Sequence, residues 1–237
     1  MDTGWDKSAE AWIRAQGEDG DWSRKHVLDR VMLERVSRHG FETALDVGCG
    51  EGRFSRLLQK RGVKTVGIDA SPRLVETARS RDPDGDYRIE RAEALAFEDD
   101  SFDLVVSYLS LIDIEDFRTA VGEMARVTRP GGVLLIANLN SFHTGGVNQR
   151  WIKDDEGEIS HWPVSHYLYE FGEWVEWEGI AVHNFHRPLS AYMSAFLSHG
   201  LKLTYFDEPE PDDVDPVRSE KYRRCPWLLV MEWEKPA

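Results

Sequence analysis

A glycine-rich turn between an apolar strand and a helix constrains this chain more than any other segment. Residues 44–54 read ALDVGCGEGRF. Residues 44–47 are a short apolar run typical of a buried parallel strand, and residues 53–61 have helical spacing with one apolar face. The turn between them needs positions that tolerate positive φ and let a ligand approach the backbone, which three glycines supply: Gly48, Gly50 and Gly52.

The spacing of these glycines and two acidic residues predict which ligand the turn holds. Dinucleotide-binding turns follow G-x-G-x-x-G, whereas here the third glycine comes one position early. Asp46, just before the turn, would repel a pyrophosphate but suits a cationic amino group. Asp69 ends a second apolar strand, where a carboxylate can accept hydrogen bonds from both ribose hydroxyls; alternatively, it caps the helix that follows Ser71. A ligand with an ammonium group and a ribose fits this pattern best.

Four sequence blocks occur in the order and spacing of one enzyme family. They read LDVGCGEG, VGIDAS, AEALAFEDDSFDLVVS and RVTRPGGVLLIANL, and they lie within residues 41–139. With these blocks the chain resembles the class I S-adenosylmethionine-dependent methyltransferases, in the branch that includes ubiquinone/menaquinone methylases and many small-molecule methylases. A single glycine turn is a weak signal, whereas four blocks at consistent spacing are a strong one.

The resemblance implies a set of contacts to S-adenosylmethionine. The residues implied are Asp46, Gly48, Cys49, Gly50 and Gly52 around the methionine portion, Asp69 and Ala70 at the ribose and adenosine, Ala92 and Glu93 beside the adenine, and Ser107 and Tyr108 near the sulfonium. The family usually has Asp just before the Ala-Glu pair, but this chain has Arg91. The adenine amino group therefore needs another acceptor, such as Glu93.

Strand and helix patterns alternate through the middle of the chain. Apolar runs predict strands at residues 44–47, 65–68, 87–91, 102–107 and 133–138, with helices at 53–61 and 115–126. This alternation predicts an α/β fold with a doubly wound, mostly parallel sheet. Two further strands, at residues 201–206 and 227–233, form an antiparallel hairpin at the sheet edge in the family, which gives a seven-stranded Rossmann-like methyltransferase fold.

We expect one domain over residues 1–237, in four parts. Residues 1–40 would form a helical cap with a helix at 22–39; its Trp5 and Trp12 either anchor a frayed terminus or belong to a lid over the cofactor. Residues 41–139 would bind the cofactor. Residues 140–187, polar and aromatic without clean periodicity, are an insertion after the fifth strand that commonly forms the acceptor pocket in this family. Residues 188–237 would supply a closing helix and the hairpin, with an acidic, solvated and mobile link at 206–220.

Composition narrows the partners. The chain has 43 acidic against 29 basic residues and a formal charge of −14, which disfavours nucleic acid. Its two cysteines, Cys49 and Cys225, make neither a disulfide framework nor a zinc site, and we expect no metal. The sequence shows no signal peptide and no membrane-spanning run. We therefore expect a cytoplasmic monomer or homodimer that acts on a small molecule away from membranes.

Three residues are candidates for catalysis. Methyl transfer from a sulfonium is an in-line displacement, and it needs a general base only if the acceptor is protonated. His186 could take that proton, with Arg187 pairing an acidic group on the substrate and Tyr192 lining the pocket; alternatively, His186 and Arg187 only begin a helix, with Arg187 in a surface ion pair. Asp113 lies near the methyl-transfer position by family analogy, or else Asp113 or Asp116 is a helix cap.

These patterns favour transfer of a methyl group from S-adenosylmethionine to an oxygen or nitrogen of a small-molecule acceptor. The alternatives are a cofactor-binding regulatory or partner subunit without its own catalysis, and a protein methyltransferase. After the fourth strand the chain reads SYLSL rather than the N/D-P-P-Y/F run of enzymes that methylate planar amide or adenine nitrogens. This difference points away from DNA adenine and glutamine-amide targets.

Overall fold

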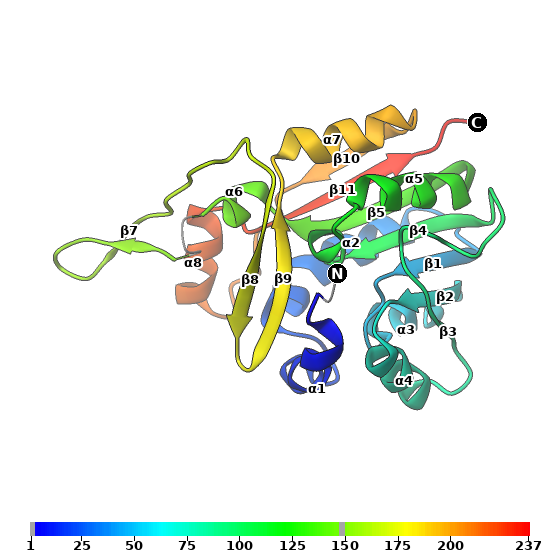
Figure 1. Cartoon of the computed structure of the whole chain (residues 1–237), viewed down its shortest axis with the longest axis horizontal. Coiled ribbons are helices and arrows are strands. Elements are labelled where there is room, and N and C mark those ends of the chain that lie inside the picture. Colours follow the sequence, from blue (N-terminus) through cyan, green and yellow to red (C-terminus); the bar gives the residue numbers. More distant parts are fainter. Residues whose placement is uncertain (1–2, 147–149) are drawn as a thin grey trace.

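A seven-stranded sheet forms the centre of the protein (Figure 1). The computed structural model describes residues 3–146 and 150–237, so the parts of the predicted cap and insertion at residues 1–2 and 147–149 lie outside the described residues. The strand order is β10-β11-β5-β4-β1-β2-β3. The sheet strands are β1 (Thr43–Val47), β2 (Lys64–Asp69), β3 (Asp86–Ile89), β4 (Phe102–Tyr108), β5 (Thr128–Leu139), β10 (Lys202–Asp207) and β11 (Leu228–Glu234).

Five of these strands are parallel, and the last two close the edge. β1 pairs in parallel with β2 and β4, β2 with β3, and β4 with β5, whereas β11 is antiparallel to β5 and β10 is antiparallel to β11. This arrangement confirms the predicted Rossmann-like fold. The carboxyl ends of β1, β2 and β4 meet at one edge of the sheet, which is where ligands bind in such folds.

Helices cover both faces of the sheet. The helical segments are α1 (Trp5–Gln16), η1 (Arg24–Leu28), α2 (Asp29–Ser37), α3 (Arg53–Gln59), α4 (Pro72–Arg81), η2 (Leu111–Asp113), α5 (Phe117–Val127), α6 (Ser141–Thr144), α7 (Leu189–Ser198) and α8 (Pro216–Arg224). Alternating side chains of β4 and β5 enter two cores: Val105 and Leu134 pack toward α5 and α7, and Leu104 and Leu135 pack toward α2 and α3. Each such buried aliphatic side chain contributes about 1.5–3 kcal/mol.

The insertion after β5 contains two hairpins, although its residues show no clean periodicity. They are formed by β6 (Ile152–Lys153) with β7 (Ile159–His161), and by β8 (Phe171–Trp177) with β9 (Ile180–His186). β9 buries Ile180 and Val182, but β8 leaves Trp174 and Trp177 exposed. Because only one strand of the β8–β9 hairpin buries a face, the usual alternation of polar and apolar residues is absent.

One expected segment differs in the structure. Part of the link predicted to be solvated and mobile instead forms α8. Its N-cap is Asp215, whose carboxylate accepts a hydrogen bond from the backbone N–H of Arg218. Ser219 and Tyr222 of α8 are buried. The Asp-Pro pair at the start of α8 is an N-cap signal, and the acidic composition around it obscured that signal. The helix expected at residues 22–39 is present as η1 followed by α2.

α1 joins the insertion to the sheet. Ser8 Oγ donates to the carbonyl of Ala181 on β9 and accepts from the N–H of the same residue, at 2.9 and 3.0 Å. Asp6 accepts a hydrogen bond from Ser71 Oγ, at the start of α4. α1 lies beside the β8–β9 hairpin in Figure 1, on the side of the molecule where β9 approaches the core. None of the helices in residues 3–146 and 150–237 is both long and apolar enough to cross a membrane.

Candidate active site

The predicted glycine turn has the backbone that its glycines allow. Gly48, Gly50 and Gly52 have φ of 73°, 57° and 80°, which is the region that favours glycine. The N–H groups of Gly48 and Cys49 both donate to the carbonyl of Ile68, so the turn is fastened to the end of β2. A Cβ at Gly48 would lie 2.3 Å from Ser110 Cβ, and the turn therefore also packs closely against the loop after β4.

Asp46 presents a buried carboxylate oxygen that has no partner. Its side chain is 1% exposed, Oδ2 accepts from Ser55 Oγ at 2.7 Å, and Oδ1 has no hydrogen bond. Burial raises the pKa of this carboxyl to about 7. A buried carboxylate is costly unless a cation or donors satisfy it, so Asp46 is prepared for a positively charged group.

Asp69 faces the same space from the end of β2. Its carboxylate accepts hydrogen bonds from the N–H of Gly50 at 2.9 Å and from the N–H of Ser71 at 2.8 Å, and burial raises its pKa. Each carboxylate oxygen keeps a further lone pair for a ligand. Ser71 is the N-cap of α4, so the alternative in which Asp69 serves only as that cap is wrong.

A cavity of about 290 Å³ runs from the glycine turn to η2. Nine of the eleven predicted cofactor residues line it: Asp46, Gly48, Cys49, Gly50, Asp69, Ala70, Ala92, Glu93 and Tyr108. The structure does not place Gly52 or Ser107 in the cavity wall. Gly52 is the N-cap of α3. The Ser107 hydroxyl is buried, and its oxygen lies 2.6 Å from the hydroxyl oxygen of Ser110, a residue that does line the cavity. Burial raises the pKa of Cys49 well above its ordinary value, so this residue is a neutral thiol in the turn.

The adenine end contains the atypical Arg91. Its guanidinium donates to Glu93 Oε1 at 2.6 Å, and both residues line the cavity. The Glu93 carboxylate, predicted as an acceptor for the adenine, is therefore already paired to a cation on one oxygen.

Aromatic side chains from the N-terminal segment form another wall. Trp5 and Trp12 line the cavity and meet edge to face at 5.8 Å, and Trp12 also packs over Gly50. Arg24 lies over the rings of Trp12 and Tyr108 and is paired with Asp21. Trp5 and Trp12 are therefore part of the cavity wall.

The sequence contained a signal for part of this wall but none for Arg24. Trp5, Ala9 and Trp12 repeat at helical spacing and form one face of α1. Arg24 belongs to no motif, and only the turn of the chain after α1 brings it to the cavity.

Asp113 lines the far end of the cavity, on η2. Its carboxylate accepts a hydrogen bond from Asn184 Nδ2 at 2.5 Å, and the Trp5 side chain lies close enough to lower its pKa. Burial raises its pKa to about 8. Asp116, rather than Asp113, caps α5, by accepting from the N–H of Thr119. Asp113 is thus a titratable group in the cavity and carries no capping role.

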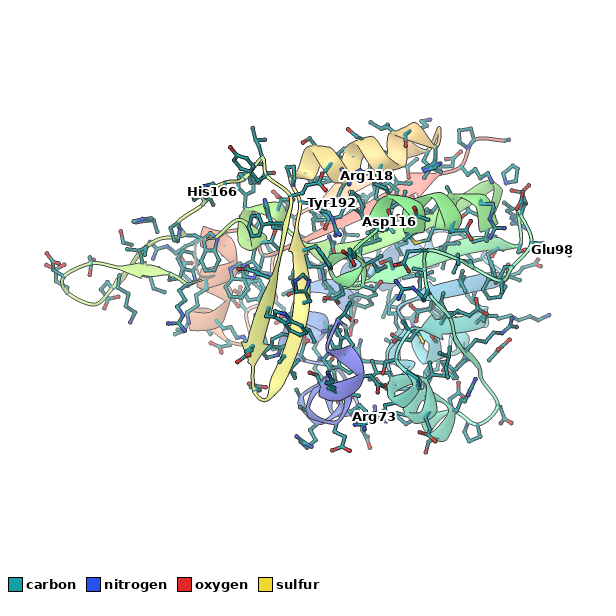
Figure 2. All side chains as sticks on the ribbon, in the orientation of Figure 1. Arg73, Glu98, Asp116, Arg118, His166 and Tyr192 are labelled. Carbon is teal, nitrogen blue, oxygen red and sulfur yellow. The ribbon has the colours of Figure 1, made fainter. Side chains whose placement is uncertain are left out.

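The structure does not bring His186 or Tyr192 into the wall of this cavity. His186 Nδ1 lies 2.7 Å from Thr144 Oγ1 and Nε2 lies 2.9 Å from the carbonyl of Tyr167, and burial lowers its pKa. Tyr192 is 1% exposed and packs edge to face on Phe117, between α7 and α5 (Figure 2). Both side chains therefore hold the fold around the site together.

Arg187 has a position that neither sequence alternative described. Its side chain is 2% exposed, so it forms no surface ion pair. It donates to the carbonyls of Leu111, Ile114 and Glu115, at 3.1, 2.5 and 2.9 Å. Arg187 thereby fastens the start of α7 to the loop that carries Asp113.

The sheet order and the cavity at its carboxyl edge are those of a Rossmann-like ligand-binding fold. Residues 45–136 match the family model described as "Methyltransferase domain", so the chain contains this domain. The malonyl-[acyl-carrier protein] O-methyltransferase of Serratia marcescens is 32% identical over 62% of this chain and 58% of its own length. The ubiquinone biosynthesis O-methyltransferase of Xanthomonas oryzae is 34% identical over 57% of this chain and 60% of its own length.

A solved structure agrees with the fold over nearly the whole chain. The S-adenosylmethionine-dependent methyltransferase from Mesorhizobium loti has a TM-score of 0.79 and 24% identity, over 92% of this chain and all of that one. The predicted resemblance to S-adenosylmethionine-dependent methyltransferases is confirmed. The chain spans less than two thirds of the length of the two curated relatives, and the matched domain omits α1 and the insertion.

Proposed function

We propose that this protein transfers a methyl group from S-adenosylmethionine to an oxygen or nitrogen of a small-molecule acceptor. The observation that carries this proposal is the unpartnered Oδ1 of Asp46, buried in the cavity wall beside the glycine turn. The ammonium group of the methionine portion supplies the cation that this oxygen lacks. A dinucleotide would bring a pyrophosphate to the same place and meet only repulsion.

The remaining residues of the cavity fit the other parts of the cofactor. Asp69 has lone pairs for the two ribose hydroxyls, and Arg24 has a guanidinium that can pair with the methionine carboxylate. The bound cofactor would supply an electrophilic methyl group on a sulfonium. The protein would hold the acceptor in line with that methyl group and keep water away from it.

The shape of the cavity supports a small acceptor over a protein substrate. Trp5 and Trp12 cover it from α1, and α1 is itself hydrogen-bonded to β9. A protein methyltransferase needs an open surface on which a second chain can dock. A carboxylate in the cavity, at Asp113, also supports an enzyme over a subunit that binds the cofactor without catalysis.

Cofactor binding and methyl transfer can be tested together. S-adenosylhomocysteine should raise the melting temperature, and Asp69→Ala should remove most of that rise, because each hydrogen bond to a charged group contributes about 1.5–3 kcal/mol. Asp69→Asn keeps the side-chain size and one acceptor oxygen, for either the Gly50 or the Ser71 amide, and serves as the conservative variant. Incubation with labelled S-adenosylmethionine and a metabolite extract should then label a small molecule. Unchanged affinity in Asp69→Ala would contradict the site, and label found only on protein would contradict the acceptor class.

A further inference from the structure

The end of the cavity beyond the predicted cofactor contacts combines a carboxylate with an aromatic ring. Asp113 and Trp5 both line this end, and the Trp5 side chain lies close enough to Asp113 to lower its pKa. Asn184 Nδ2 donates a hydrogen bond to Asp113 Oδ1 and fixes the carboxylate. Carboxylates and indole rings are the two kinds of group that attract an ammonium ion in a partly desolvated site.

The charges around the cavity also favour a cation. Seven carboxylate residues line the cavity, against three arginines. Arg53 is paired with Asp29 and Arg91 with Glu93, and Arg24, beside Asp21, is assigned above to the methionine carboxylate of the cofactor. Arg187 is also unavailable, because its guanidinium donates to three backbone carbonyls. An acidic acceptor would therefore meet the carboxylate of Asp113 without a dedicated cation in the described part of the wall.

We propose that the acceptor is a small amine, which enters as its ammonium form and is held by Asp113 and Trp5. This proposal rests on the function proposed above and narrows the acceptor atom to nitrogen. Trp5, which lines this end, and Asn184, which holds Asp113, both lie outside the matched domain at residues 45–136. The acceptors named for the two curated relatives therefore do not indicate which acceptor binds at this end of the cavity.

The same contact prepares the amine for reaction. Asp113 takes one proton from the ammonium, which leaves a neutral amine with a free electron pair beside a neutral carboxyl group. The nitrogen then forms a bond to the methyl carbon while the carbon–sulfur bond breaks and its electron pair stays on sulfur. The positive charge passes from the sulfonium to the methylated nitrogen, and the Asp113 proton leaves to solvent when the product is released.

The surroundings of Asp113 suit this proton transfer. The pKa of Asp113 is about 8, raised mainly by burial and also by the charge of Asp69, against the lowering effects of Trp5, Asn184 and Arg24. These groups face Asp113 from β2, α1, β9 and η1. A carboxyl group with this pKa accepts a proton from an ammonium more readily than an ordinary aspartate does.

Matched sets of ligands test the proposal. The first set is phenethylamine, phenethyl alcohol and hydrocinnamate, and the second is butylamine, butanol and pentanoate. Titration calorimetry measures the binding of each compound to the full chain saturated with S-adenosylhomocysteine. Each compound is also incubated with the protein and S-adenosylmethionine, and the products are analysed by mass spectrometry. We expect at least one amine to bind about tenfold or more tightly than its alcohol and its acid, and to gain a methyl group on nitrogen.

A pair of isosteric variants separates the Asp113 contact from a general effect on the fold. Asp113→Asn should lower amine affinity about tenfold or more and leave S-adenosylhomocysteine affinity within about twofold. Asp116→Asn makes the same change three residues later, at the start of α5 (Figure 2), where Asn caps as well as Asp does, and it should change neither affinity.

The outcomes distinguish this proposal from the one on which it rests. If S-adenosylhomocysteine does not bind, the proposed function fails, and the amine assignment fails with it. If the cofactor product binds but no amine exceeds its alcohol and its acid, or if Asp113→Asn binds the preferred amine as tightly as the wild type, only the amine assignment is overturned.

Discussion

Replacing Asp46 with Asn should stabilise the cofactor-free protein at neutral pH and weaken cofactor binding. Burial raises the pKa of this carboxyl from 3.8 to about 7 in the folded protein. The folded state therefore binds the proton more tightly than the unfolded chain does. The free energy of unfolding is higher by this difference below pH 4, and the difference is lost as the pH rises from 4 to 7. Each pH unit between the two pKa values lowers the free energy of unfolding by about 1.4 kcal/mol. Ionisation of Asp46 therefore lowers it by about 4 kcal/mol at pH 8, relative to acid pH.

Asn is nearly isosteric and keeps the acceptor for Ser55 Oγ while it carries no charge. Since about 1 kcal/mol changes the melting temperature of a chain of this size by about 2–4 °C, Asp46→Asn should melt several degrees higher at pH 8 and close to the wild type at pH 4. Its affinity for S-adenosylhomocysteine should fall about 10- to 100-fold at pH 8. Wild-type affinity should itself fall as the pH drops below 7, because the ammonium prefers the ionised carboxylate, whereas the variant should lack this dependence.

Thermal unfolding without ligand and calorimetric titration with S-adenosylhomocysteine, both from pH 4 to pH 8, measure these effects. Asp103→Asn is the matched control. Asp103 is also buried, at the other end of the sheet, but its carboxylate accepts from the N–H groups of Glu42 and Thr43, each at 2.8 Å. This control should be less stable at pH 8 and bind the ligand normally. An Asp46→Asn protein with lower stability at pH 8 and unchanged affinity would refute the reasoning.

Three further substitutions test the roles of residues around the cavity. His186→Ala should keep turnover within about threefold and lower the free energy of unfolding by about 1–3 kcal/mol, because both ring nitrogens are bonded away from the cavity. Arg187→Met should raise KM for the acceptor and leave S-adenosylhomocysteine affinity within about twofold, since three carbonyls of the loop beside Asp113 lose their donor. Glu232→Gln should lower the free energy of unfolding in urea by about 1.5–3 kcal/mol without changing cofactor affinity, because it weakens the charged hydrogen bonds of the half-buried Arg35.

Each of these expectations has an opposing result. A large loss of turnover in His186→Ala at full occupancy of both ligands would return His186 to the mechanism. An Arg187→Met enzyme with wild-type KM would show that the loop holds Asp113 without this guanidinium. A Glu232→Gln protein as stable as the wild type would show that the ion pair with Arg35 contributes nothing net.

The sequence by itself determined the fold class and the cofactor end of the cavity. Asp46 and Asp69 lie at the carboxyl ends of adjacent parallel strands, and the glycines of the turn lie between them in the chain. The carboxyl ends of parallel strands meet at one edge of a sheet. Residues at the ends of two successive strands, and the turn between them, are therefore close in space as well as in sequence. A local motif is therefore enough to predict this part of the site, including the positive φ of Gly48 and Gly50.

The acceptor end was decided by the tertiary structure. Trp5, Asp113 and Asn184 come from three distant parts of the chain, and no spacing within any one of them indicates their contact. The sequence selected the segment around His186, but His186 lies two residues beyond Asn184 on β9, which is roughly 7 Å along a strand. That step places the histidine against Thr144 and Tyr167 and leaves the amide to face the cavity carboxylate. The residue of β9 that reaches Asp113 depends on where this strand passes the cavity. The packing of the β8–β9 hairpin against α1 and η2 determines where it passes.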